Sequence, residues 1–241
     1  MASKEVTIKS HRYTISYEIF NPTLEPCILI LHGWGANKEI MKKAFLPYFI
    51  NLKQIYIDLP GFGNSPLTHP LYTKDYAHIV REFLDKLNLK PEFILGHSFG
   101  GKVATLLNPP NLVLLSSAGI IQKKPFLVRL KIKIFKFLKL IGFGKFYKFF
   151  ASKDVAGMSK EMYETLKNVV DENFYNIFKN YKGKAYLFWG KEDRATPLKS
   201  GEEIARIIKN SEFYPLSGDH FFFLLHAEFI TKTIQNRDQK C

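Results

Sequence analysis

The chain has few cysteines, few acidic residues relative to basic ones, and no long apolar run free of charge. Only two of its 241 residues are cysteines, Cys27 and Cys241, which argues against a disulfide-stapled scaffold and favours a reducing compartment. No uncharged apolar run approaches the roughly 18 residues that a transmembrane helix needs. Residues 1–10 lack the apolar core of a signal peptide. These absences predict a cytoplasmic protein without a membrane-spanning segment.

Acidic residues number 22 against 35 lysines and arginines, which gives a formal charge of +13. Such a charge favours acidic partners, although it carries no information about the fold. Apolar residues make up 46% of the chain, which is enough for a large buried core and argues against global disorder. The length suits one large domain, or one domain that carries an insertion.

Short apolar runs alternate with helical patterns along most of the chain. Residues 5–19 alternate apolar and polar side chains around a turn near Ser10 and His11, which predicts an antiparallel hairpin. Thr73 is the expected N-cap of one helix. The alternation predicts an α/β fold with a mostly parallel sheet covered by helices on both faces. The further predicted strands are 27–31, 54–57, 93–95, 112–115, 185–189 and 212–216, and the predicted helices are 38–49, 73–88, 98–107, 197–209 and 220–234.

A G-x-S-x-G motif lies where the chain passes from a predicted strand to a predicted helix. Residues 96–100 read G-H-S-F-G, and another glycine follows. The turn is so sharp that side chains at the flanking positions would clash, so glycines are needed there. The turn exposes the serine hydroxyl at a helix N-terminus, whose dipole favours developing negative charge. This context makes Ser98 the predicted nucleophile.

A serine nucleophile needs a base, and the base needs an acid that orients it. His220 follows a predicted strand near the C-terminus and is the predicted base, whereas His226 falls inside the last helical pattern. Asp193 follows another predicted strand and is the predicted acid. Its rivals are Glu192, which comes one residue early, and Asp219, which is too close in sequence to reach behind the neighbouring ring.

The negative charge that develops on a carbonyl oxygen needs preorganised N–H donors. The backbone amide of Phe99, directly after the nucleophile, is one predicted donor. The amide of Trp34 is the other, because it lies in the H-G-W-G loop that follows the strand 27–31. His32, at the start of this loop, is interpreted as a brace for the loop rather than a catalytic residue.

Five motifs together resemble the α/β-hydrolase superfamily, in that family's order and over nearly the whole chain. The family's chain order of nucleophile, acid and histidine agrees with the three residues proposed above. The resemblance implies an α/β-hydrolase fold with an eight-stranded, mostly parallel sheet, and chemistry that needs no metal and no organic cofactor. The motifs are LHGWG at 31–35, DLPGFGNS at 58–65, GHSFGG at 96–101, WGKEDRATP at 189–197 and GDHF at 218–221.

The same resemblance implies a hydrolase core formed by residues 1–119 and 181–241. Residues 120–180 interrupt the alternation of strands and helices, read as entirely helical, and are expected to form a lid over the active site. Within the family, Asp58 and Gly61 usually shape a structural turn, so no chemistry is assigned to them.

Two branches of the superfamily look closest. Carboxylesterases of the pimeloyl-carrier-protein methyl ester type share H-G-W-G and D-L-P-G-F-G-x-S, which implies hydrolysis of a carboxylic ester through an acyl-enzyme. Meta-cleavage-product hydrolases, which split carbon–carbon bonds in 2-hydroxy-6-oxo-dienoates, are the alternative. They commonly have Asn where this chain has His97 and Trp where it has Phe221. A membrane-bound lipase and a non-catalytic binding protein with the same fold are further alternatives.

The segment 123–148 holds nine lysines and arginines and no acidic residue. Its apolar residues recur at helical spacing, which predicts an amphipathic lid helix. Three interpretations stay open: the lysines are simply solvated, they dock an acidic carrier protein, or they hold the helix on an anionic membrane surface. No nucleic-acid recognition motif is visible, so no nucleic-acid partner is expected. The phenylalanines of the lid favour a small-molecule ester or ketone substrate with an apolar acyl part.

Overall fold

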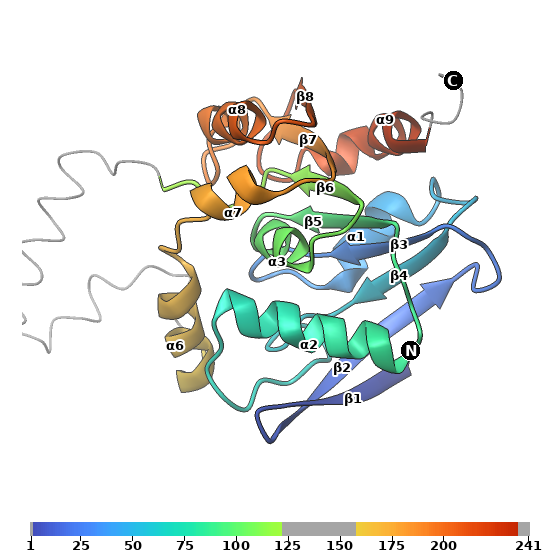
Figure 1. The fold of residues 1–241 in the computed structure, drawn as a ribbon, viewed down its shortest axis with the longest axis vertical. Helices are drawn as coiled ribbons and strands as arrows, with labels where there is room; N and C mark the ends of the chain where they lie inside the picture. The colour runs from blue at the N-terminus through green and yellow to red at the C-terminus, as the bar shows by residue number, and fades with distance from the viewer. Residues whose placement is uncertain (1, 122–157, 236–241) are drawn as a thin grey trace, which may run out of the picture.

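The structure is a computed structural model that describes residues 2–121 and 158–235 (Figure 1). Within these residues, eight strands form one sheet in the order β1-β2-β4-β3-β5-β6-β7-β8. Strands β1 and β2 form the predicted hairpin, β2 pairs antiparallel with β4, and all other neighbouring pairs are parallel. The strands are β1 (Ala2–Ile8), β2 (His11–Phe20), β3 (Cys27–Leu31), β4 (Lys53–Ile57), β5 (Phe93–His97), β6 (Asn111–Leu115), β7 (Lys184–Gly190) and β8 (Ser211–Leu216).

The central parallel strands are mainly apolar because helices cover both faces of the sheet. Strands β3, β5 and β6 are buried at every residue. Successive side chains point to opposite faces, so Ile28 and Ile30 join one hydrophobic core while Leu29 and Leu31 join the other. The predicted α/β architecture, with an eight-stranded and mostly parallel sheet, is confirmed.

Helices α1 (Lys38–Phe45) and α9 (Phe223–Gln235) pack on one face of the sheet. Helices α2 (Thr73–Lys86), α3 (Phe99–Leu107) and α8 (Leu198–Ile207) pack on the other face, where α2 and α3 lie side by side (Figure 1). None of the described helices is both long and apolar enough to cross a membrane.

The N-cap of α2 and the start of the last helix differ from the sequence prediction. Thr73 is the first helical residue of α2 rather than its N-cap, which is Tyr72, and the carboxylate of Asp75 accepts the Tyr72 amide at 2.9 Å. The last helix starts at Phe223, not at residue 220, because residues 219–222 form a turn in which the Asp219 carboxylate accepts the amide of residue 221. His220 therefore lies in a turn.

Part of the predicted lid is described. Helices α6 (Lys160–Val169) and α7 (Tyr175–Asn180) agree with the helical prediction, and α6 lies beside the start of α2 (Figure 1). The prediction that 120–180 is entirely helical is wrong, because residues 120–121, 158–159 and 170–174 are not helical. The Thr165 hydroxyl accepts the amide of Leu71 at 3.1 Å, which ties α6 to the loop before α2. The basic segment 123–148 lies outside the described residues, so its docking to a carrier protein or membrane stays a prediction.

Candidate active site

The predicted nucleophile stands on a strained turn between β5 and α3. Ser98 has φ +50° and ψ −114°, a conformation that non-glycine residues rarely adopt and that costs about 1–3 kcal/mol. A Cβ atom at Gly96 would overlap the carbonyl of Gly100, and one at Gly100 would overlap the carbonyl of His32. The Ser98 amide donates to the Leu115 carbonyl at 3.0 Å, which fixes the turn to β6. The sequence therefore folds here into the strand–turn–helix that the motif predicted.

An aspartate and a histidine meet at the carboxyl ends of β7 and β8. The Nδ1 of His220 donates to Asp193 Oδ2 at 2.7 Å. The other oxygen of Asp193 accepts the amides of Ala195 and Thr196 at 2.8 and 2.9 Å. Because a carboxylate only accepts, the neutral imidazole carries its proton on Nδ1, and its Nε2 keeps a free lone pair. That arrangement suits a general base.

Burial and hydrogen bonds act in opposite directions on the Asp193 carboxyl. Only 5% of the residue is exposed, and this burial alone would raise its pKa. The bonds from His220 and Thr196 outweigh burial and lower the pKa of Asp193 to about 2. The carboxylate is thus ionised over the whole range in which an imidazole titrates.

The alternative candidates for the acid and the base form hydrogen bonds with other residues. The Glu192 carboxylate accepts the amide of Gly218, and the Asp219 carboxylate accepts the amide of Phe221 at 2.8 Å. His226 lies in α9, where its Nε2 is 2.9 Å from the carbonyl of Ser217. Within the described residues, the Asp193–His220 hydrogen bond is thus formed by the two residues that the sequence favoured for base and acid.

His97, which directly precedes Ser98 in the chain, contacts His220. His97 donates from Nε2 to the carbonyl oxygen of His220 at 2.9 Å, and the two rings are 4.6 Å apart between centroids. The hydrogen bonds of the His220 ring to described residues go to Asp193 and Thr196, and none joins it to the Ser98 hydroxyl.

The two predicted oxyanion donors lie beside the nucleophile. Phe99 is the first residue of α3, so its amide has no acceptor within the helix. The rings of Trp34 and Phe99 pack edge to face at 5.6 Å. Among the hydrogen bonds of the described residues, none uses the amide of either residue.

His32 behaves as the brace that the sequence suggested. It is fully buried, its Nδ1 donates to the Gly33 carbonyl at 2.7 Å, and its Nε2 accepts the Leu59 amide at 3.0 Å. Burial lowers the pKa of His32 to about 4, so the ring is neutral at physiological pH. It links the loop after β3 to the loop after β4.

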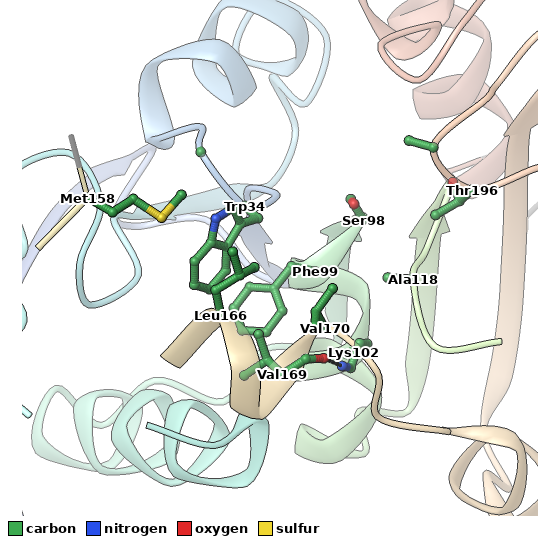
Figure 2. Close-up of a pocket in the computed structure, with 12 residues that line it drawn as sticks. Trp34, Ser98, Phe99, Lys102, Ala118, Met158, Leu166, Val169, Val170 and Thr196 are labelled. Carbon is green, nitrogen blue, oxygen red and sulfur yellow. Dashed lines mark hydrogen bonds between the residues drawn. The ribbon is translucent and has the colours of Figure 1, made fainter. Parts of the chain in front are cut away.

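A cavity of about 710 Å³ opens at Ser98. Figure 2 shows Ser98 between Trp34 on one side and Thr196 on the other. The volume of this cavity lies in the range of ordinary small-molecule sites. The wall is mainly apolar, and its apolar side chains come from the loop after β3, from α3 and from the α6 region: Trp34, Phe99, Met158, Leu166, Val169 and Val170.

Two residues of the site escaped the sequence analysis. The hydroxyl of Thr196 lies 2.8 Å from Asp193 Oδ2 and 3.0 Å from the Ser116 carbonyl, so it orients the carboxylate. A hydroxyl residue three positions after an aspartate in a loop is a recognisable signal for such a turn.

Lys102 is the second missed residue. It is 1% exposed and lines the cavity, and its ammonium donates to the Val169 carbonyl at 2.6 Å (Figure 2). The ammonium also pairs with the Glu172 carboxylate at 2.8 Å. The ammonium also lies 4.7 Å from the ring centre of Phe174. Burial lowers the pKa of Lys102, with Glu172 opposing that effect. The contacts of Lys102 with Val169 and Glu172 join α3 to the end of α6.

A second buried charge pair lies next to the loop that follows β3. Asp58 and Lys38 are 0% and 1% exposed, and their charged groups are 2.7 Å apart. The carboxylate of Asp58 also accepts the amides of Lys38 and Asn64 at 2.8 and 2.9 Å.

In the described residues, no group of three or more histidine, cysteine or acidic side chains could hold a metal ion.

Comparison with known proteins assigns the chain to a family. The model of the alpha/beta hydrolase family matches residues 28–232. The chain belongs to this family. A mouse monoacylglycerol lipase, ABHD6, is 25% identical over 79% of this chain and 68% of its own length. The pimeloyl-[acyl-carrier protein] methyl ester esterase of Pseudoalteromonas atlantica is 32% identical, over 41% of this chain and 40% of its own.

The solved structures agree with this assignment. An esterase from Thermogutta terrifontis has a TM-score of 0.74 at 16% identity, and the match covers 100% of this chain and 99% of the esterase. The predicted α/β-hydrolase fold is confirmed. As a member of the alpha/beta hydrolase family with esterase and lipase relatives, the protein is an enzyme, a hydrolase of the esterase or lipase kind.

Proposed function

We propose that this hydrolase cleaves carboxylic esters through an acyl-enzyme, with Ser98 as nucleophile, His220 as general base and Asp193 as the acid that orients the base. The observation that supports this most directly is the 2.7 Å bond between His220 and Asp193, beside a strained serine at the edge of an apolar cavity. Strained backbone conformations cluster at active sites, where the surrounding structure holds a residue in the geometry that the reaction needs.

The reaction divides into two halves. As the Ser98 hydroxyl attacks the ester carbonyl, His220 Nε2 takes its proton, and the amides of Trp34 and Phe99 donate to the oxyanion. The carbon–oxygen bond to the alcohol then breaks, and the imidazolium protonates the leaving alcohol. In the second half, water attacks the acyl-serine while His220 again takes the proton. The bond between the acyl carbon and Ser98 Oγ then breaks, the imidazolium returns the proton to Oγ, and the carboxylic acid leaves. Ionised Asp193 stabilises the imidazolium in both halves.

The cavity suggests the substrate. Its wall beside Ser98 is mostly aliphatic and aromatic, which suits an apolar acyl chain. Two relatives are named for ester substrates, a methyl ester in one and a monoacylglycerol in the other. The residues at 97 and 221 differ from those common in carbon–carbon hydrolases, so an ester is favoured over a dienoate.

Hydrolysis of p-nitrophenyl esters with acyl chains of increasing length tests the proposal. We expect wild type to hydrolyse them with an optimum at one length, and Ser98→Ala to lose on the order of 10³- to 10⁶-fold in kcat. Ser3→Ala, which changes an exposed serine on β1, is the matched control and should keep full activity. If wild type is inert on every ester but cleaves a 2-hydroxy-6-oxo-dienoate, the carbon–carbon alternative replaces this proposal.

A further inference from the structure

His97 occupies a position between the proposed nucleophile and the proposed base. It ends β5, directly precedes Ser98, and is 1% exposed. Its Nε2 lies 2.9 Å from the carbonyl oxygen of His220. Its ring packs at centroid distances of 4.6 Å on His220, 4.8 Å on Phe223 and 5.4 Å on Phe221. One side chain thus connects the nucleophile turn to the turn that carries the base.

The hydrogen bond fixes the protonation of the ring. A carbonyl oxygen only accepts, so Nε2 of His97 carries the proton and Nδ1 carries the lone pair. That Nδ1 is buried and has no hydrogen-bond partner among the described residues. Burial lowers the pKa of His97 to about 3, with the neighbouring His220 acting in the same direction, so the ring stays neutral.

Stability alone gives a poor account of a histidine here. An unpartnered buried nitrogen destabilises the fold relative to an apolar group of the same shape. The surrounding rings of Phe221 and Phe223 would accept a leucine without that cost. The one favourable polar contact of the His97 side chain among the described residues is the bond to the His220 backbone.

The ring also backs the loop that carries a proposed oxyanion donor. A Cβ atom at Gly33 would lie 2.8 Å from His97 Nδ1 and 3.1 Å from the Ser98 Cβ, so loop, ring and nucleophile are in close contact. Gly33 directly precedes Trp34. The His97 ring therefore touches the surroundings of the nucleophile, the base and the oxyanion loop at once.

The turn that carries His220 needs a restraint from this side. Its backbone bonds to the acid loop include those from the Glu192 amide to the Gly218 carbonyl and from the Lys191 amide to the Leu216 carbonyl. Neither of these bonds is made to β5 or to the turn that carries Ser98. The bond from His97 supplies the second restraint.

We propose that His97 is a positioning residue, whose Nε2–H bond to the His220 carbonyl sets the base at the correct place relative to Ser98. This inference rests on the proposed triad. A displacement of about 1 Å between reacting groups can cost on the order of 10²-fold in rate. Loss of the bond is therefore expected to lower the rate of serine attack while leaving substrate binding and folding largely intact.

Two substitutions separate the hydrogen bond from the bulk of the ring. His97→Leu keeps a similar volume and removes the donor, whereas His97→Gln keeps an N–H donor near the position of Nε2. His78→Leu is the matched control, because His78 is exposed on α2 and far along the chain from the site. Each variant is compared with wild type in thermal unfolding, in ester hydrolysis and in the rate at which a fluorophosphonate labels the serine.

The expected result for His97→Leu is a fall of about 10- to 100-fold in kcat and in labelling rate, with KM within about threefold of wild type and Tm not lowered. His97→Gln should recover most of the lost rate, and His78→Leu should match wild type.

Two results would overturn the inference. In the first, His97→Leu is labelled and turns over at the wild-type rate. In the second, activity falls only in proportion to lost folded protein and glutamine does not restore it, which would make His97 a packing residue. If wild type itself is not labelled and hydrolyses no ester, the proposed function fails first, and the inference fails with it.

Discussion

Two buried aspartates at the same edge of the sheet have similar surroundings and different chemistry. Asp58 follows β4 and Asp193 follows β7, and both carboxylates accept two backbone amides as well as one basic side chain. In both, burial would raise the pKa, and the hydrogen bonds and the basic partner lower it below the ordinary value. The partners differ: Lys38 is sealed in the core, whereas the His220 side chain is 18% exposed.

The difference bears on the role that we propose for Asp193. Lys38 and Asp58 are both buried away from the cavity, and their pair holds α1 against the loop after β4. The His220 imidazole has two nitrogens, and while Nδ1 is held by Asp193, Nε2 keeps a lone pair. The two carboxylates are alike, and under the proposed function it is the basic partner that gives them different roles.

The largest expected effect comes from Asp193→Asn. The asparagine amide donates to Nδ1 and stabilises the wrong tautomer, so kcat on the best ester should fall on the order of 10⁴-fold. The variant should remain folded, because asparagine retains an oxygen for the amides of Ala195 and Thr196. Steady-state kinetics alongside circular dichroism measure both quantities. A variant that keeps more than a tenth of the wild-type kcat would remove Asp193 from the mechanism.

Asp58→Asn should show the opposite pattern. It leaves the Lys38 ammonium buried without its counter-charge, which is expected to lower the unfolding free energy by about 3–5 kcal/mol. The kcat of the protein that remains folded should stay within a few-fold of wild type. Urea unfolding and active-site titration check the two parts. A collapse of kcat with no loss of stability would assign chemistry to Asp58.

The double variant Lys38→Met/Asp58→Asn sharpens this contrast. Removing both charges leaves no unpaired ion in the core, so the double variant should be more stable than the sum of the two single variants by about 1–3 kcal/mol. A double-mutant cycle by urea unfolding gives this coupling energy. Strict additivity of the single variants would show that the two charges do not interact.

The smallest expected effect is on acid stability. The pKa of Asp193 is about 2 in the folded protein against an ordinary value of 3.8, so its ionised form stabilises the fold. That contribution, roughly 2 kcal/mol, is fully present above the unfolded-state pKa and is lost as the pH falls toward 2.

The comparison that isolates this contribution uses Asp193→Asn, which should flatten the corresponding part of the curve of unfolding free energy against pH. Chemical unfolding at several pH values between 5 and 2 measures it. Parallel curves for the two proteins would contradict the strongly lowered pKa.

Local sequence patterns predicted most of the fold because the signals are themselves local. A few neighbouring residues are enough to predict two features: the strand β3, from its continuous apolar run, and the turn at Ser98, from the glycines around it. The start of α9 was placed too early because the run from Phe221 onward looks helical, and only the hydrogen bond from the Asp219 carboxylate shows that a turn comes first.

The pairings that bring distant residues together were beyond the sequence. Lysines on amphipathic helices are expected to face water, yet Lys38 and Lys102 are buried. Each forms an ion pair with a carboxylate from another part of the chain, Lys38 with Asp58 and Lys102 with Glu172. The contact of His97 with the His220 carbonyl joins positions 123 residues apart. Such contacts depend on how loops meet at the sheet edge, which periodicity does not encode.

The most direct test of the central claim is to map the residue that a fluorophosphonate modifies and to measure how its rate depends on the two aspartates. We predict one adduct, on Ser98, formed at least 10²-fold more slowly in Asp193→Asn and at nearly the wild-type rate in folded Asp58→Asn. An adduct on another residue, no adduct at all, or equal rates in the two variants would contradict the assignment of Ser98, His220 and Asp193.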